Sequence, residues 1–139
     1  MIQVTNTATQ AVAVGAPLTF SKITLRSCGA CECFNSQVPT SIKLCGKGTY
    51  EIHFSANITS DAAATPIQLA LAVAGNALVE TAMNAVPAAA GDLVNVHTST
   101  LFKNCCGDLD RISVINTGAN ALTVAQNPNL YIVKVSNEC

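Results

Sequence analysis

The stretch Thr49–Asn57 (TYEIHFSAN) decides the fold, because its apolar and polar side chains alternate strictly. The apolar positions are Tyr50, Ile52, Phe54 and Ala56, and the polar positions between them are Glu51, His53 and Ser55. Successive side chains of a β-strand point to opposite faces of the sheet, so this stretch predicts a strand with one buried and one solvent-facing side. We expect the two titratable side chains, Glu51 and His53, to point away from the core.

A second long strand is predicted over Asp92–Phe102 by the same alternation. The side chains expected on its inner face are Val94, Val96, Thr98, Thr100 and Phe102, and those expected on its outer face are Asn95, His97 and Ser99. Both histidines of the chain are therefore predicted to face outward.

Period-two spacing also favours a strand over a helix in Thr65–Val79, whose apolar positions are Ile67, Leu69, Leu71 and Val73. Gly75-Asn76 then predicts a turn into a second strand at Ala77–Thr81.

Shorter apolar runs between Gly, Asn and Pro turns complete the pattern. They are Leu18–Leu25, Thr40–Leu44, Arg111–Asn116, Leu122–Ala125 and Leu130–Ser136. About eight to ten strands in two packed antiparallel sheets, an all-β jelly-roll sandwich, are therefore expected. We predict one domain over residues 18–136, an N-terminal arm or first strand over 1–17, and a short tail at 137–139.

Composition narrows the function. The chain has 139 residues, of which 50% are hydrophobic and 11% charged, with a formal net charge of −1. No excess of positive charge is present to neutralise phosphates, so we do not expect a nucleic-acid partner. No apolar run is long enough to span a membrane, and the first ten residues do not form a signal-peptide pattern. Because half of the residues are hydrophobic and few are charged, we expect an apolar surface, part of which lies against other chains.

Several of these segments resemble the C1q/TNF-like jelly-roll superfamily. Gly48–Phe54 is similar to its G-x-Y-x-[FI]-x-[FY] strand, and Ala90-Gly91-Asp92 to the loop that opens its next long strand. Ile112–Gly118 and Leu130–Val135 resemble its closing hairpin. The similarity extends over most of the chain and is greatest to short bacterial and phage members, such as spore-surface collagen-like C-terminal domains and phage virion proteins.

The resemblance implies a ten-stranded sandwich that forms a tight homotrimer and serves in binding or as a structural cap, not as an enzyme. It also implies that both histidine-bearing strands lie in the inner sheet, whose outer face lines the three-fold axis. The candidate axis residues are then Glu51, His53, Asn95 and His97. They either bind an anion, a metal or water there, or form hydrogen bonds that serve packing alone.

Cysteine is the second notable feature of the sequence. The seven cysteines are Cys28, Cys31, Cys33, Cys45, Cys105, Cys106 and Cys139. Disulfides within or between chains, a zinc site at the C-x₂-C spacing of Cys28 and Cys31, and free buried thiols all remain open, and we favour disulfides. An odd number cannot all pair within one chain, and Cys139 is placed to reach a neighbouring molecule.

Other chemistry is weakly supported. Asp108 and Asp110 form a D-x-D pair that would suit calcium, although a solvated turn is the preferred interpretation. Cys45 with His53 or His97 lacks a recognisable third group for catalysis. We therefore expect no catalytic residues and no cofactor.

Together these observations predict a non-enzymatic structural or attachment protein on the outside of a particle. A phage capsid decoration, head fibre or appendage protein on the virion surface, bound to capsid or other surface proteins, is the first hypothesis. A bacterial cell-surface or spore-coat protein, and a receptor- or glycan-binding module at a fibre tip, are the alternatives.

Overall fold

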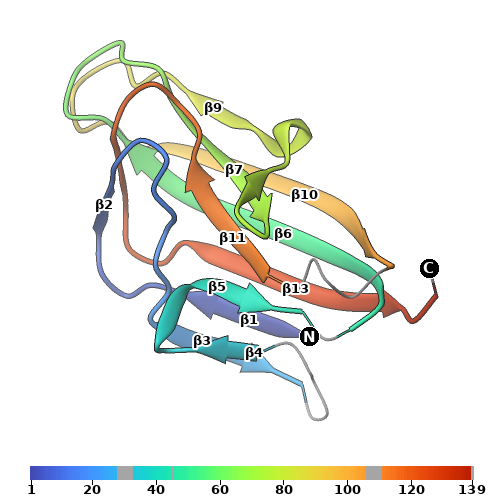
Figure 1. Cartoon of the computed structure of the whole chain (residues 1–139). Helices are drawn as coiled ribbons and strands as arrows, with labels where there is room; N and C mark the ends of the chain where they lie inside the picture. Colours follow the sequence, from blue (N-terminus) through green and yellow to red (C-terminus); the bar gives the residue numbers. More distant parts are fainter. Residues whose placement is uncertain (28–32, 45, 106–110, 139) are drawn as a thin grey trace.

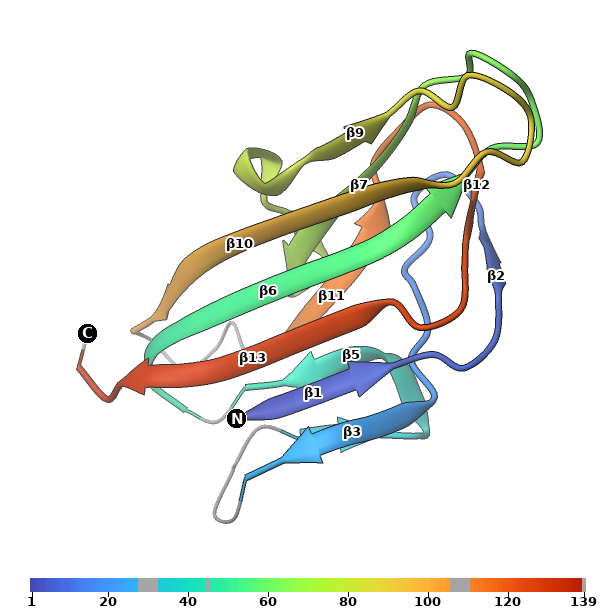
Figure 2. The ribbon, with the colours of Figure 1, turned by 180° about the vertical axis from the view of Figure 1, so that it is seen from behind.

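The computed structural model describes residues 1–27, 33–44, 46–105 and 111–138. Two antiparallel sheets pack face to face over these residues, and the core lies between them (Figures 1 and 2). The predicted fold class, a jelly-roll sandwich, is confirmed. None of the described residues forms a helix long and apolar enough to cross a membrane.

One sheet has seven strands and lies at the front of Figure 2. Its order is β2-β12-β6-β13-β1-β3, and β10 pairs with the other edge of β6. The bounds are β1 Ile2–Thr5, β2 Gln10–Val12, β3 Lys22–Arg26, β6 Gly48–Thr59, β10 Val94–Asn104, β12 Leu122–Val124 and β13 Asn129–Ser136.

The other sheet has six strands and lies at the front of Figure 1. Its order is β4-β5-β11-β7-β8, with β9 paired to β7. The bounds are β4 Cys33–Asn35, β5 Val38–Lys43, β7 Ile67–Val73, β8 Asn76–Ala77, β9 Met83–Ala85 and β11 Arg111–Asn116. A 3₁₀ turn, η1 (Val79–Thr81), follows β8.

The core forms where the apolar alternation of the two sheets meets. In β6, Tyr50, Ile52 and Phe54 are at most 1% exposed, as predicted. Leu69 and Leu71 of β7 are fully buried against them from the opposite sheet, which confirms the strand interpretation of that segment. The two long predicted strands thus become the centre of the sandwich.

The N-terminal region differs from the expected pattern. Of the two interpretations offered for residues 1–17, the structure has strands there, β1 and β2, with β1 between β13 and β3. The strand expected over Leu18–Leu25 is instead β3, which begins at Lys22. Leu18 and Phe20 are buried, but their amides bond to Val114 and Pro39 of the six-stranded sheet, because the chain is still crossing between the sheets at this point.

Further details correct the sequence interpretation. No strand was predicted between Leu18–Leu25 and Thr40–Leu44, but the structure has β4 there, a short strand that pairs with β5. The hairpin turn after β7 centres on Ala74-Gly75, with φ of +49° and +83°, and Asn76 already pairs with Val73. The chain then enters η1 instead of continuing as a strand to Thr81. Because short strands such as β2, β4, β8 and β9 also pair, the described residues contain thirteen strands, more than the predicted eight to ten.

Asn116 fixes the exit from β11. Its side chain is fully buried and donates hydrogen bonds to the carbonyl oxygens of Val12, at 3.2 Å, and Asn120, at 2.9 Å. Its own Oδ1 accepts a hydrogen bond from the amide of Gly118 at 3.0 Å. The segment Asn116-Thr117-Gly118 therefore joins β11 to the connection that leads to β12.

Candidate functional site

The solvent side of the seven-stranded sheet is the most extensive candidate surface. We call it the open face (Figure 2). The strand register places the following side chains on it: Gln3, Leu25, Glu51, His53, Ser55, Asn95, His97, Ser99, Leu101, Asn129, Tyr131 and Val133. All four residues predicted to lie near an axis, Glu51, His53, Asn95 and His97, are on this face, as the alternation required.

The structure brings two of these four side chains together. Nε2 of His53 lies 2.9 Å from Oε1 of Glu51, two residues back on the same strand. On the neighbouring strand the ring of Tyr131, directly opposite His53, is 5.6 Å away between ring centroids. The two side chains of the pair are 42% and 41% exposed in the single chain. At that exposure the pair contributes little to the stability of the monomer.

The other two predicted axis residues have different neighbours. Asn95 donates a hydrogen bond to Oδ1 of Asn57 at 3.0 Å. His97 is opposite Ser55 in the β6–β10 ladder, whereas the residue opposite His53 is Ser99, so the two histidines are not paired with each other. Together with Asn84, both Asn95 and His97 line a hollow of about 280 Å³ between β9 and β10.

Apolar side chains on the open face were not singled out by the sequence analysis. Leu101 of β10 is 68% exposed, and Val133 of β13 is partly exposed. Both are directly opposite Glu51 in the ladder, one on each side, so apolar side chains flank this position of the open face. The signal was present in the sequence, since the alternation that turns His97 outward also turns Leu101 outward.

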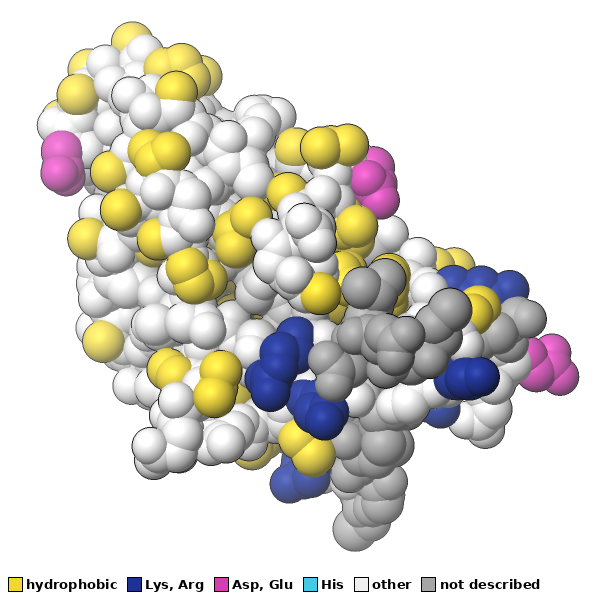
Figure 3. Space-filling model, in the orientation of Figure 1, with side chains coloured by type: hydrophobic (Ala, Val, Ile, Leu, Met, Phe, Trp, Pro, Cys, Tyr) yellow, Lys and Arg dark blue, Asp and Glu magenta, His cyan; other side chains and the backbone are white. Residues whose placement is uncertain are grey.

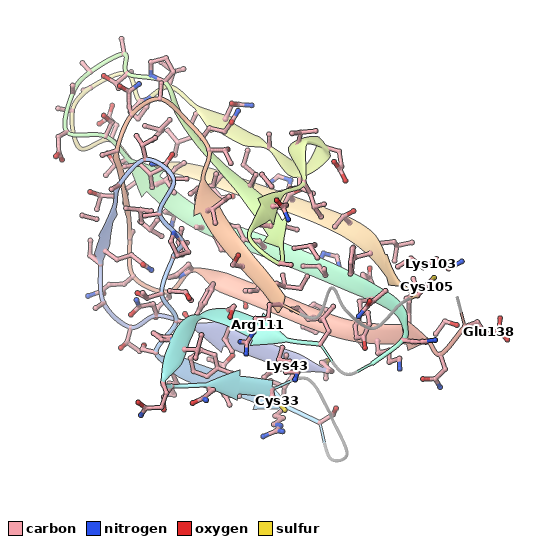
Figure 4. All side chains as sticks on the ribbon, viewed as in Figure 1. Cys33, Lys43, Lys103, Cys105, Arg111 and Glu138 are labelled. Atoms are coloured by element: carbon pink, nitrogen blue, oxygen red, sulfur yellow. The ribbon has the colours of Figure 1, made fainter. Side chains whose placement is uncertain are left out.

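Of the seven cysteines, the structure describes two. Cys33 begins β4, and Cys105 directly follows β10; both are exposed. The five others, Cys28, Cys31, Cys45, Cys106 and Cys139, lie outside the described residues. Cys33 pairs with Lys43 of β5, which pairs in turn with Arg111 of β11, and residues 106–110 join that arginine to Cys105. Cys33 and Cys105 are thus at the same end of the sandwich (Figure 4).

The proposed metal sites are not tested by this geometry. Asp108 and Asp110 lie outside the described residues, as do both cysteines of the C-x₂-C pair. Within the described ranges, no group of three or more His, Cys, Asp or Glu side chains is placed to hold a metal ion. Disulfides, zinc and calcium therefore remain predictions.

Comparison with known proteins supports the architecture. No protein-family model matches the chain, and no curated protein matches it. Similar solved structures include Eiger TNF from S. frugiperda, with a TM-score of 0.75 at 12% identity over 99% of this chain and 93% of that one. The globular domain of zebrafish complement 1qA gives 0.67 at 11% identity, over 99% and 98% of the two chains. Murine APRIL gives 0.64 at 15% identity, over 96% and 97%.

These likenesses extend over nearly the full length of each chain and define the class of fold. The protein has a C1q/TNF-like jelly-roll sandwich, as the sequence resemblance implied. At identities of 11–15% the likeness shows the fold alone.

Proposed function

We propose that the protein is a non-enzymatic structural or attachment protein that assembles as a homotrimer through its open face. The observation that carries this proposal is the combination of exposed apolar and polar side chains on one regular sheet surface. Leu101 and Val133 flank Glu51 of the Glu51–His53 pair there. Association would remove this apolar area from water, a favourable change of about 25 cal/mol per Å².

The polar side chains of the open face are also suited to contacts between three copies around an axis. Side chains with both donor and acceptor groups, such as His97, Ser99 and Asn129, lie beside the apolar ones. Such groups can form hydrogen bonds with their own copies across an axis, so that burial does not leave them without partners.

The test is the mass of the assembled protein. Light scattering at micromolar concentration is expected to give about three times the chain mass of 14.3 kDa. Leu101→Asp should shift the protein toward monomer, because it would place a charge inside the interface. The matched control is Val79→Asp, since Val79 is 80% exposed in η1, which belongs to neither face of the seven-stranded sheet.

A parent protein that stays monomeric under these conditions would contradict the assembly. So would a Leu101→Asp variant that keeps the parent mass. Circular dichroism of both variants separates loss of assembly from loss of folding.

We further propose that the trimer resides on the outside of a particle, with a phage virion first and a bacterial or spore surface second. Support comes from the small size, the weak charge and the exposed apolar side chains, which suit repeated assembly against other protein surfaces. Immunogold electron microscopy of particles from the native source would test this. Label on virions, or on cell or spore surfaces, would distinguish the two hypotheses, and label confined to the cell interior would contradict both.

A further inference from the structure

A second surface feature lies on the opposite side of the molecule, on the solvent face of the six-stranded sheet. There β5 pairs with β11 only at Arg111↔Lys43 and Ile112↔Ile42. Beyond that point β5 no longer pairs with β11, and the neighbour of β11 is the chain around Pro17, which forms an isolated β-bridge with Ile115. A pocket of about 460 Å³ lies beside this divergence, within the range of small-ligand sites, about 300–1,000 Å³.

Alternation along β11 forms the floor and walls of this pocket. Arg111, Ser113 and Ile115 are two residues apart and share the solvent face. The central residue, Ser113, is small and is paired with Ala72 of β7, which is smaller still. A hollow therefore lies between a cationic wall and an apolar one.

Polar groups converge on the cationic side. The guanidinium of Arg111 donates one hydrogen bond, from Nη1 to Oγ of Ser41 at 3.3 Å, and it has five N–H donors. The hydroxyls of Thr40 and Ser113 also line the pocket, and neither forms a hydrogen bond with another residue in the part of the chain that the structure describes. The remaining donors and these hydroxyls are thus available to a ligand.

Basic side chains lie beside the pocket. Lys43 is directly opposite Arg111 across the β5–β11 ladder, and Figure 4 shows the two side chains near each other at the same end of the sheet. In the space-filling view, Lys and Arg side chains gather over this part of the face (Figure 3). The guanidinium of Arg111, which lines the pocket, favours an anion beside it.

We propose that this pocket binds an acidic saccharide, a sugar ring that carries a carboxylate. Arg111 would receive the carboxylate, because its planar fork matches two carboxylate oxygens. The hydroxyls of Thr40, Ser41 and Ser113 both donate and accept, as sugar hydroxyls require. Pro17 and Ile115 offer an apolar surface to the C–H face of the ring.

A saccharide suits this geometry better than a peptide. An extended peptide is usually held by main-chain hydrogen bonds along a free strand edge. Here the pocket lies over the middle of the sheet, where β11 is paired with β7 on one side and with β5 and the chain around Pro17 on the other. An acidic saccharide would be the ligand of the attachment role proposed above. Its binding does not depend on the trimer, because the pocket is built from one chain on the side away from the open face.

The test is a two-dimensional NMR or calorimetric titration of the full chain with N-acetylneuraminate and glucuronate. Glucose, acetate and a short acidic peptide serve as comparison probes. We expect saturable binding of at least one acidic sugar, with amide shifts at Ser41, Ser113 and Ile115, and much weaker binding of the comparison probes. Arg111→Gln should weaken the acidic sugar about tenfold or more, since a hydrogen bond to a charged group contributes about 1.5–3 kcal/mol.

Two variants complete the design. Ser113→Val should also weaken binding, because it fills the hollow without changing charge, whereas Lys22→Gln should bind like the parent although it removes the same charge from β3. The proposal is overturned if neither acidic sugar binds, if Arg111→Gln binds like the parent, or if acetate or the acidic peptide binds as well as the sugars. Light scattering of the same samples reports on the trimer separately, so failure here leaves the assembly proposal intact.

Discussion

At the scale of single residues, Gly48 is the glycine with the least room for a side chain among those that the structure describes. Its φ is +143°, in a region that side-chain-bearing residues rarely adopt. A Cβ there would lie 2.3 Å from the carbonyl oxygen of Ser136 and 2.4 Å from Cε of Lys134. The lysine could move, but the carbonyl belongs to β13, where the ladder with β6 shifts register. Glycine is therefore required at the start of β6.

Gly48→Ala is expected to destabilise the protein by about 2–4 kcal/mol, from backbone strain together with the clash. The matched control is Gly91→Ala, where φ is +83° but no atom lies within 4 Å of the added Cβ. That change should cost only about 1 kcal/mol, for the left-handed conformation alone. Chemical denaturation of both variants measures the difference, and equal losses would show that contact with β13 does not matter.

At the scale of elements, the alternation of the long strands was sufficient to predict their faces. In β6 and β7 each predicted inner residue is buried, and in β10 the register turns Asn95 and His97 outward as expected. The strands that the sequence analysis did not identify are short. β4 and β9 have three residues each, too few for a period of two to be distinguished from chance.

The candidate surfaces differ in how far sequence could predict them. The open face follows from alternation in three long strands, so Glu51 and His53 were found, although their direct contact was not. The pocket was not predictable, because its residues come from four separate places in the chain: 15–17, 40–41, 74–75 and 111–115. Only the divergence of β5 from β11 brings them together, and no local pattern encodes that divergence.

The β7–β8 hairpin offers a test of turn chemistry. Both central residues have positive φ, a conformation for which Asn-Gly is preferred, but the first position here is Ala74. Ala74→Asn should stabilise the protein by about 0.5–1 kcal/mol, since asparagine tolerates positive φ better than alanine. Ala13→Asn, at an exposed alanine without positive φ, should give no such gain in the same denaturation measurement. Equal effects at the two sites would argue against the turn as the cause.

At the scale of the whole molecule, the two described cysteines lie at one end, together with the residue before the C-terminal cysteine. Cys33, Cys105 and Glu138, the residue before the last cysteine, all lie there (Figure 4). Links formed at that end, within a chain or between chains, would leave the loops at the opposite end unconstrained. This arrangement suits a protein that is locked together at one end after assembly.

Reduction is accordingly expected to weaken the protein prepared from its oxidised native source. Each disulfide that closes a long loop contributes about 2–4 kcal/mol, so a reductant should lower the melting temperature by several degrees. Thiol titration should find fewer than the seven encoded thiols, and non-reducing gels should show slower bands if chains are linked. A variant with every cysteine replaced by serine is the control and should not respond to reductant. Seven reactive thiols in a metal-free sample would contradict both the disulfide and the zinc interpretations.

The position of the last strand has a consequence for the order in which the chain can fold. β13 lies inside its sheet, between β6 and β1, and so pairs residues 129–132 with residues 2–5. On the ribosome, β1 emerges before β13 and cannot join it until residues 129–132 have been made. Until then β6 and β1 each present an unpaired edge, the kind of surface that recruits other chains. Closing so long a loop is slow, so we expect the partly made chain to be prone to pairing with its neighbours until β13 is in place.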